Sequence, residues 1–132
     1  MKVIIAGGRK FKDYELVKET LDKFKKENNI TEIVSGKANG ADSLGEKYAK
    51  DHDIIIKEFP AKWNDIEGKL PKEVIFNAFG KKYWINAGFR RNEEMAEYAD
   101  CLIAFWDKQS NGTKNMISLA KKYNLKVIVI NY

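Results

Sequence analysis

The chain of 132 residues has very little cysteine and histidine, and this scarcity excludes several kinds of site. Its one cysteine, Cys101, lies in the apolar run CLIAFW, so the chain offers neither an internal disulfide nor a cysteine metal site. Its one histidine, His52, lies near the end of a predicted helix and far from the glycine-rich loops. We therefore expect no metal site and no histidine-based catalytic triad.

Long apolar runs are also absent. No run approaches the roughly 20 residues that a membrane-spanning helix needs, and the N-terminus begins with a strand pattern in place of a signal-peptide layout. With 44% hydrophobic residues, the chain has enough apolar material for one core, and it is too short for two ordinary domains. We expect a cytoplasmic protein in which residues 1–132 form a single domain that does not bind membranes.

Arginine is scarce as well, although the chain is basic. Lysine and arginine together number 24 against 19 acidic residues, a net charge of +5. The lysines are spread among the acids, which is typical of a solvated surface and does not favour nucleic-acid binding. Arginine occurs only at Arg9, Arg90 and Arg91. Because the planar guanidinium suits two-point recognition of anions, these positions are candidates for a ligand site.

Apolar runs and helical periodicities alternate along the chain and predict a parallel α/β fold. KVIIA at 2–6 is a continuous apolar strand, as expected in a parallel sheet covered on both faces. The same reasoning predicts strands at 32–35, 54–59, 101–106 and 126–130, and helices at 14–28 (capped by Asp13), 41–51, 87–99 and 113–123. This order predicts a Rossmann-like three-layer sandwich, a five-stranded parallel sheet with helices on both faces.

The segments that follow the strands are expected to carry the function, because ligands bind there in such sheets, near the point where the strand order reverses. These segments are GGRKF (7–11), SGKANGAD (35–42), PAKW (60–63) and WDKQSNGT (106–113). Three are rich in glycine and small polar residues, and two run into helix N-termini, where backbone N–H groups and the helix dipole favour anions. The pattern predicts a phosphate site; glycines that only turn the chain are the alternative.

Familiar nucleotide-binding motifs are missing. No G-x-G-x-x-G follows the first strand, and the second strand ends in Ser35 where a dinucleotide-binding fold has an acidic residue for the ribose. No G-K-[ST] sequence marks a Walker loop. An ordinary dehydrogenase is therefore not expected.

The two adjacent arginines have different predicted roles. Arg90 lies three, four and seven residues before glutamates, so we expect it to face solvent beside an acidic stripe. Arg91 shares a face with the apolar residues four and eight positions later, and that face must pack on the sheet. From the first turn it could reach over the strand ends to a ligand. The alternative is a core arginine paired with a carboxylate such as Asp42 or Asp100.

Five ordered motifs resemble those of a known family: GGRKF, SGKANGAD, FPAKW, AGFRRNEEMAEYADCLIAFWD and SNGTKNMI. They are similar to motifs of the YspA-like branch of the SLOG superfamily, named for the Smf/DprA and LOG proteins. The resemblance covers nearly the whole chain and implies a Rossmann-like domain that binds nucleotides or nucleotide derivatives, such as ADP-ribose-like ligands, at the strand ends. Together with the loop pattern it predicts these ligand-binding residues: Gly7, Gly8, Arg9, Ser35, Gly36, Gly40, Ala41, Asp42, Arg91, Asn92, Asp107, Ser110, Gly112 and Thr113.

The resemblance also bears on catalysis. LOG proteins are phosphoribohydrolases, and Arg91 falls on their catalytic arginine. Their loop continues G-T-x-x-E, whereas Met116 occupies the glutamate position here, and a methionine cannot stabilise an oxocarbenium ion or transfer a proton. We therefore predict no catalytic residue and no cofactor; if the chain is an enzyme, the candidates are Arg91, Asp42 and Asp107. Lys37 replaces the small residue of the motif, and it either adds a charge for phosphate or points to solvent.

One segment lies outside the sheet pattern. KEVIFNAFGKKYW at 72–84 predicts a β-hairpin inserted before the arginine-bearing helix. Its aromatic residues could close over a bound base, form a contact in a homo-oligomer or pack against the rest of the chain. Two functional classes stay open: a nucleotide-binding sensor or sequestering module, and a hydrolase of an N-glycosidic or phosphate bond in a nucleotide, related to the LOG enzymes. A nucleic-acid-binding role gains little from the scattered lysines.

Overall fold

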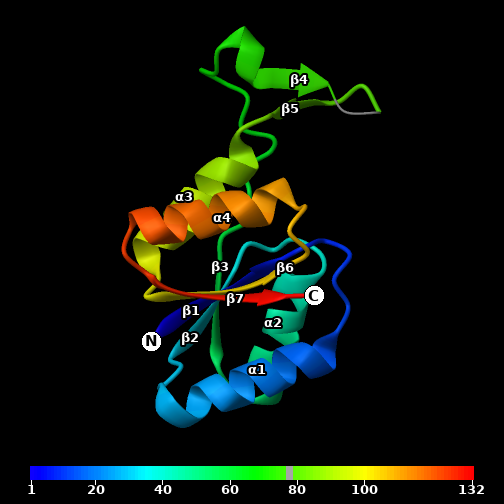
Figure 1. The fold of residues 1–132 in the computed structure, drawn as a ribbon. Helices are drawn as coiled ribbons and strands as arrows, with labels where there is room; N and C mark the ends of the chain where they lie inside the picture. The colour runs from blue at the N-terminus through cyan, green and yellow to red at the C-terminus, as the bar shows by residue number, and fades with distance from the viewer. Residues whose placement is uncertain (77–78) are drawn as a thin grey trace.

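The computed structural model of the protein describes residues 1–76 and 79–132, and a five-stranded sheet lies at its centre (Figure 1). Its strands are β1 (Lys2–Gly7), β2 (Glu32–Ser35), β3 (Ile55–Glu58), β6 (Cys101–Trp106) and β7 (Lys126–Asn131). They lie in the order β3-β2-β1-β6-β7, and every pairing between them is parallel. The predicted sheet is confirmed, and its strand order reverses between β1 and β6.

Helices cover both faces of the sheet, as predicted. Figure 1 shows α3 (Ala87–Tyr98) and α4 (Asn111–Lys122) above the sheet, with α1 (Tyr14–Glu27) and α2 (Ala41–Asp51) below it. Successive side chains of β1 alternate between two cores: Val3 and Ile5 pack with residues of α1 and α2, and Ile4 packs with residues of α3 and α4. No helix within the described residues is long and apolar enough to cross a membrane.

The ends of several elements differ from the prediction by one or two residues, and local hydrogen bonds explain part of this. Asp13 caps α1 as predicted, since its Oδ1 accepts a hydrogen bond from the Leu16 N–H at 3.1 Å. Helix α4 begins at Asn111, not Thr113, because the Oγ of Ser110 accepts from the Thr113 N–H and makes Ser110 the cap. β3 is shorter than predicted because it is an edge strand that pairs only along the four residues of β2.

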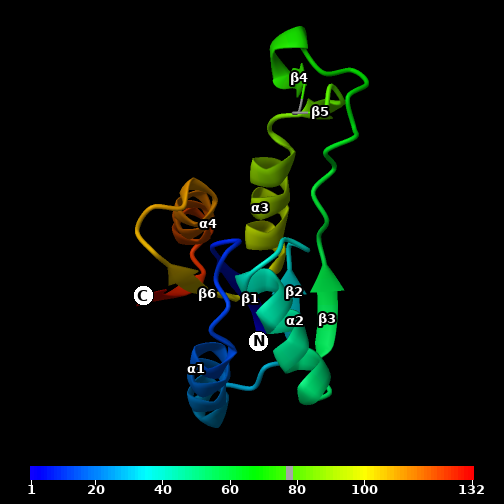
Figure 2. The ribbon, with the colours of Figure 1, turned by 90° about the vertical axis from the view of Figure 1, so that its right-hand side faces the viewer.

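The inserted segment forms a short antiparallel hairpin. It comprises the 3-10 turn η1 (Pro71–Glu73), β4 (Val74–Phe76) and β5 (Lys82–Trp84). The predicted hairpin over 72–84 is confirmed for the described residues; 77–78 lie outside them. Figures 1 and 2 show the hairpin beyond the N-terminal end of α3, and Figure 2 shows the β3 arrow pointing towards it. The hairpin therefore stands on the carboxyl side of the sheet, where ligands bind in this type of fold.

Candidate anion-binding site at the strand ends

The carboxyl end of β1 lies at the centre of the site. Gly7 at the end of β1 pairs with Phe105 of β6, so the loops that follow these two strands leave the sheet side by side. Helices α2 and α4 follow strands β2 and β6, so their N-termini lie at the same edge. The strand order reverses here, and sheets of this type bind ligands at that point.

Two glycines allow the loops at this edge to approach one another. A Cβ on Gly7 would lie 2.5 Å from the carbonyl oxygen of Phe105 and 2.7 Å from the Cβ of Ala41. Gly40, just before α2, has a φ of +80°, and a Cβ there would lie 2.2 Å from the carbonyl oxygen of Gly8. These positions need glycine for close backbone packing, so part of the predicted ligand signal has a structural cause.

A small cavity of about 70 Å³ lies between these loops and helices α3 and α4. We call it the strand-end cavity. Two almost fully buried methionines, Met95 and Met116, contribute to its lining. The rest of the lining is Ala6, Gly7, Ala38, Asp42, Arg91, Asn92, Ser110, Gly112 and Thr113. The cavity thus gathers predicted site residues from four separate segments of the chain.

Arg91 reaches the cavity from α3 and is partly buried. Its Nη1 donates a hydrogen bond to the carbonyl oxygen of Gly36, and its Nε donates to Asn92 Oδ1 at 3.0 Å. Burial lowers the pKa of Arg91; the carboxylate of Asp42 opposes this, and the charge of Arg9 adds to it. The guanidinium is therefore a fixed, partly desolvated cation, which favours binding of an anion.

Asp42, at the start of α2, is the acidic group of the cavity and is only 6% exposed. Its Oδ2 accepts hydrogen bonds from the N–H groups of Gly36 at 3.1 Å and Ala38 at 3.4 Å. Burial raises the pKa of Asp42 to about 6, although the charge of Arg91 and these two N–H groups act against it. Of the two carboxylates considered as partners of Arg91, Asp42 is the one beside it; Asp100 instead accepts a hydrogen bond from the first residue of β1.

Asn92 connects Arg91 to the N-terminus of α4. Its buried amide accepts the hydrogen bond from Arg91 Nε and donates to Asn115 Oδ1 at 3.0 Å and to the carbonyl oxygen of Gly112 at 3.4 Å. All of these contacts are within the protein. Asn92, expected to contact a ligand, is thus placed to orient both the arginine and the helix end that line the cavity.

Seven predicted site residues do not line the cavity, and the side chains of two of them, Ser35 and Asp107, bond within their own loops. The Ser35 hydroxyl donates to Glu46 Oε2 at 2.6 Å and accepts from the Lys37 N–H at 3.1 Å. The Asp107 carboxylate accepts from the N–H groups of Ser110 at 2.9 Å and of the residue before it at 2.8 Å, and these bonds lower the pKa of Asp107. Both side chains hold their own loops in shape. The other five are Gly8, Arg9, Gly36, Gly40 and Ala41, and of these Arg9 lines a different hollow, described below.

Arg90 behaves as predicted. Its guanidinium forms an ion pair with Glu93 and lies 3.6 Å from Glu94 Oε1, and all three side chains are on the outer side of α3. The two neighbouring arginines therefore have different environments. Arg91 faces the strand-end cavity, whereas Arg90 faces the solvent.

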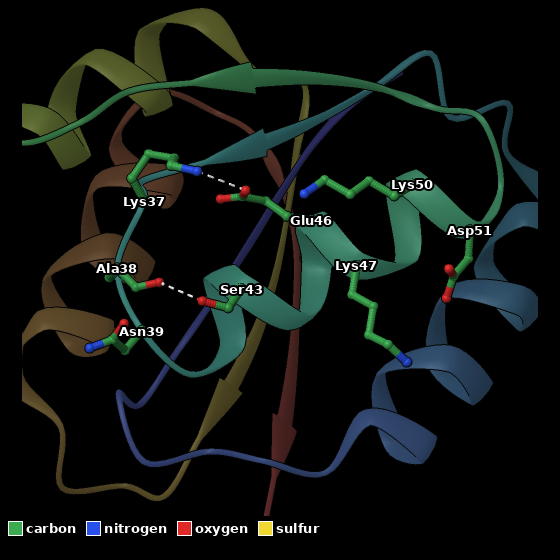
Figure 3. A pocket seen from close by; sticks show the side chains of 8 residues that line it. All are labelled: Lys37, Ala38, Asn39, Ser43, Glu46, Lys47, Lys50 and Asp51. Atoms are coloured by element: carbon green, nitrogen blue, oxygen red, sulfur yellow. Dashed lines mark hydrogen bonds and ion pairs between the residues drawn. The ribbon is translucent and has the colours of Figure 1, made fainter.

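A larger hollow of about 460 Å³ lies on the outer face of α2 (Figure 3). We call it the α2 hollow; its lining is Lys37, Ala38, Asn39, Ser43, Glu46, Lys47, Lys50 and Asp51. Lys37 is exposed, as one of its two predictions had it, and it is also paired: its Nζ lies 2.9 Å from Glu46 on α2 and 2.8 Å from Glu58 at the end of β3. Its φ is +59°, a conformation that small residues adopt more readily.

A third hollow, of about 550 Å³, opens between the hairpin and the loop after β1. We call it the hairpin groove; its lining is Arg9, Trp63, Asn64, Lys81, Lys82, Tyr83 and Ile85. Trp63 and Tyr83 form an edge-to-face pair with ring centroids 5.9 Å apart. The sequence pattern missed this pairing because 20 residues separate the two rings, and no periodicity connects the end of PAKW to a hairpin strand.

The comparisons with known proteins agree with the motifs. Residues 1–65 match a family described as "YspA, cpYpsA-related SLOG family", which confirms the predicted resemblance over those residues. No curated protein and no solved structure matches the chain. Arg91 and the N-terminus of α4 lie outside the matched range, and their assignment rests on the geometry above. The described residues contain no cluster of three or more histidine, cysteine or acidic side chains that could hold a metal.

Proposed function

We propose that the protein binds a nucleotide or a nucleotide-derived ligand and acts as a sensor or sequestering module; the match of residues 1–65 to the SLOG family supports this class of ligand. The ligand lies at the carboxyl edge of the sheet, and a phosphate group of the ligand occupies the strand-end cavity. One observation carries the proposal: Arg91 and the first turns of α2 and α4 converge on one cavity where the strand order reverses.

The chemistry of the cavity supports a phosphate in particular. The first N–H groups of a helix have no carbonyl partner within the helix, and the helix dipole favours negative charge there. Arginine adds a fork of donors that matches phosphate oxygens. Sites for whole ligands measure about 300–1,000 Å³, so a cavity of about 70 Å³ accepts one small group while the rest of the ligand lies outside.

Binding measurements with two adjacent arginine variants test this proposal. We expect Arg91→Ala to weaken nucleotide binding at least about tenfold, since a charge-assisted hydrogen bond contributes about 1.5–3 kcal/mol. Arg90→Ala is the matched control, and its affinity should stay close to that of the original protein, because surface ion pairs contribute little. Calorimetric titration with a panel of nucleotides measures both. Equal losses in the two variants, or none in either, would remove the site from this cavity.

The methionine at position 116 is evidence that the protein binds its ligand without hydrolysing it. It is 1% exposed and lines the cavity at the position where the resembling hydrolases have their glutamate. No carboxylate therefore stands on α4 to stabilise an oxocarbenium ion. Adenosine monophosphate incubated with the protein should be recovered intact, as measured by mass spectrometry of bound and released material.

A hydrolase is the second candidate, and Asp42 is the observation that favours it. Its carboxyl group lines the same cavity as Arg91, and burial raises its pKa to about 6, a value suited to proton transfer near neutral pH. Release of ribose 5-phosphate from adenosine monophosphate by the unmodified protein, lost in both Asp42→Asn and Arg91→Ala, would establish this activity and replace the proposal of a pure binding module.

A further inference from the structure

We infer that the hairpin groove receives the base of a nucleotide whose phosphate lies in the strand-end cavity, with Trp63 as the main contact of the base. This inference rests on the proposed function and extends it, because it assigns a role to the inserted segment and a minimal ligand: a base joined to a phosphorylated sugar. The groove is about 550 Å³ in volume, within the range of sites that hold such molecules.

The groove and the cavity meet at Arg91. A Cβ placed on Gly88 would lie 3.2 Å from Cη2 of Trp63 and 3.8 Å from Nη2 of Arg91, so the indole ring and the guanidinium border the same point on α3. Arg91 lines the cavity, whereas Trp63 lines the groove. Arg9 also lines the groove and is close enough to Arg91 to lower its pKa. A ligand can therefore extend from one hollow to the other past the two arginines.

The aromatic pair of the groove is held in position before any ligand binds. The Trp63 carbonyl accepts a hydrogen bond from the Trp84 N–H at 2.8 Å, which joins the segment before the hairpin to β5. The edge-to-face contact with Tyr83 fixes the ring from the side of the hairpin. Trp63 nevertheless keeps 36% of its surface exposed. A large aromatic ring that is fixed but exposed, next to a cation, is suited to contact with a planar base.

The charge of the groove favours the same kind of ligand. Its lining includes Arg9, Lys81 and Lys82, and none of the described residues that line it is acidic. In the α2 hollow, by contrast, the lining itself contains Glu46 and Asp51 beside its lysines. The positive lining favours a ligand that carries one or more phosphates next to its base.

Titration with three probes tests the inference: adenosine monophosphate, ribose 5-phosphate and adenosine. We expect adenosine monophosphate to bind at least about tenfold more tightly than ribose 5-phosphate, since stacking of a base on an aromatic residue has this order of effect. Trp63→Ala should remove most of that difference and leave the affinity for ribose 5-phosphate unchanged. Trp63→Leu, which keeps apolar bulk against Gly88, should do the same and serves if the alanine variant fails to fold.

Phe89→Ala is the matched control. Phe89 is an exposed aromatic residue (49%) in the first turn of α3 and lines a different hollow, so this variant should bind all three probes like the original protein. If adenosine monophosphate and ribose 5-phosphate bind equally well, or if neither Trp63 variant narrows the difference, the groove does not hold the base and the inference is wrong. The proposed function fails separately, if no phosphorylated probe shows binding that depends on Arg91.

Discussion

The strand-end cavity and the α2 hollow both contain cations and acids, and they differ in how these charges are satisfied. In the α2 hollow, Lys37 is held by Glu46 and Glu58, and Figure 3 shows its ammonium directed at Glu46. In the cavity, Arg91 is partly buried, donates to a backbone carbonyl and an amide oxygen, and has one buried carboxylate, Asp42, beside it. The hollow is the larger of the two, yet the proposed ligand site is the cavity.

The difference shows that the number of cations is a poor guide to an anion site. Lys37 is solvated and lies between two glutamates, so the three side chains together carry a net negative charge that disfavours an anion. A guanidinium that has lost part of its hydration interacts more strongly with a phosphate than a fully hydrated guanidinium does. Helix N-termini at the same point add donors that cannot move away. Desolvation and fixed geometry therefore distinguish the cavity from the hollow.

The largest effect is expected from a change at the backbone of the cavity edge. Gly40→Ala should lower the free energy of unfolding by at least about 3 kcal/mol, because it combines backbone strain at φ +80° with a Cβ placed 2.2 Å from the Gly8 carbonyl oxygen. Urea denaturation measures this. Gly112→Ala is the control for stability, since a Cβ there meets no atom within 4 Å. Similar stabilities for both variants would show that the loops are not packed as described.

The sheet and its loops could be predicted from the sequence, whereas the contacts inside the cavity could not. The alternation of apolar strands and helices predicted the sheet, since each burial pattern is local in the chain. The glycine loops and Arg91 were expected at one edge because the carboxyl ends of parallel strands meet there, and Gly7, Gly112 and Arg91 do line one cavity. Asp42 is buried beside Arg91, which is far from it in the sequence, and Asn92 positions the start of α4 through Gly112, 20 residues away. Contacts of this kind carry no periodic signal along the chain.

Asp42 provides the next largest effect, on the pH dependence of stability. Its pKa is about 6 in the folded protein, against 3.8 for an unperturbed aspartate, so the folded state holds this proton more tightly than the unfolded state. Its contribution to stability is therefore fully present below pH 3.8 and is lost as the pH rises through about 6. The difference of about 2 in pKa corresponds to a loss of about 3 kcal/mol at most.

Asp42→Asn isolates this effect, because its amide oxygen can still accept the hydrogen bonds from Gly36 and Ala38 while the group no longer titrates. Denaturation curves between about pH 4 and pH 7 should show a smaller fall in stability for the variant than for the original protein. Parallel curves for the two proteins would mean that the carboxyl group is not desolvated in the cavity.

Substitution of Arg9 tests, by ligand affinity, whether the ligand binds at the strand-end cavity or in the α2 hollow. Arg9→Ala should weaken binding of adenosine monophosphate about tenfold, because it removes a cation between the cavity and the hairpin groove. Lys47→Ala is its counterpart in the α2 hollow, where the ammonium lies 3.8 Å above the ring of Tyr14. This variant should bind like the original protein. A larger loss for Lys47→Ala than for Arg9→Ala would move the ligand to the α2 hollow.

The smallest effect is expected at Lys37. Its neighbour in the sequence, Ala38, lines the strand-end cavity, whereas Lys37 itself lines the α2 hollow. Hydrogen bonds to Glu46 and Glu58 raise the pKa of Lys37, so its charge is held by these acids. Lys37→Gly removes both ion pairs and at the same time relieves a φ of +59°, two changes of opposite sign for stability. Since no ligand contact is lost, affinity for adenosine monophosphate should stay within about twofold of the original protein. A tenfold loss of affinity in the same titration would show that Lys37 binds the ligand in place of its two glutamates. The strand-end cavity and the α2 hollow would then form one site.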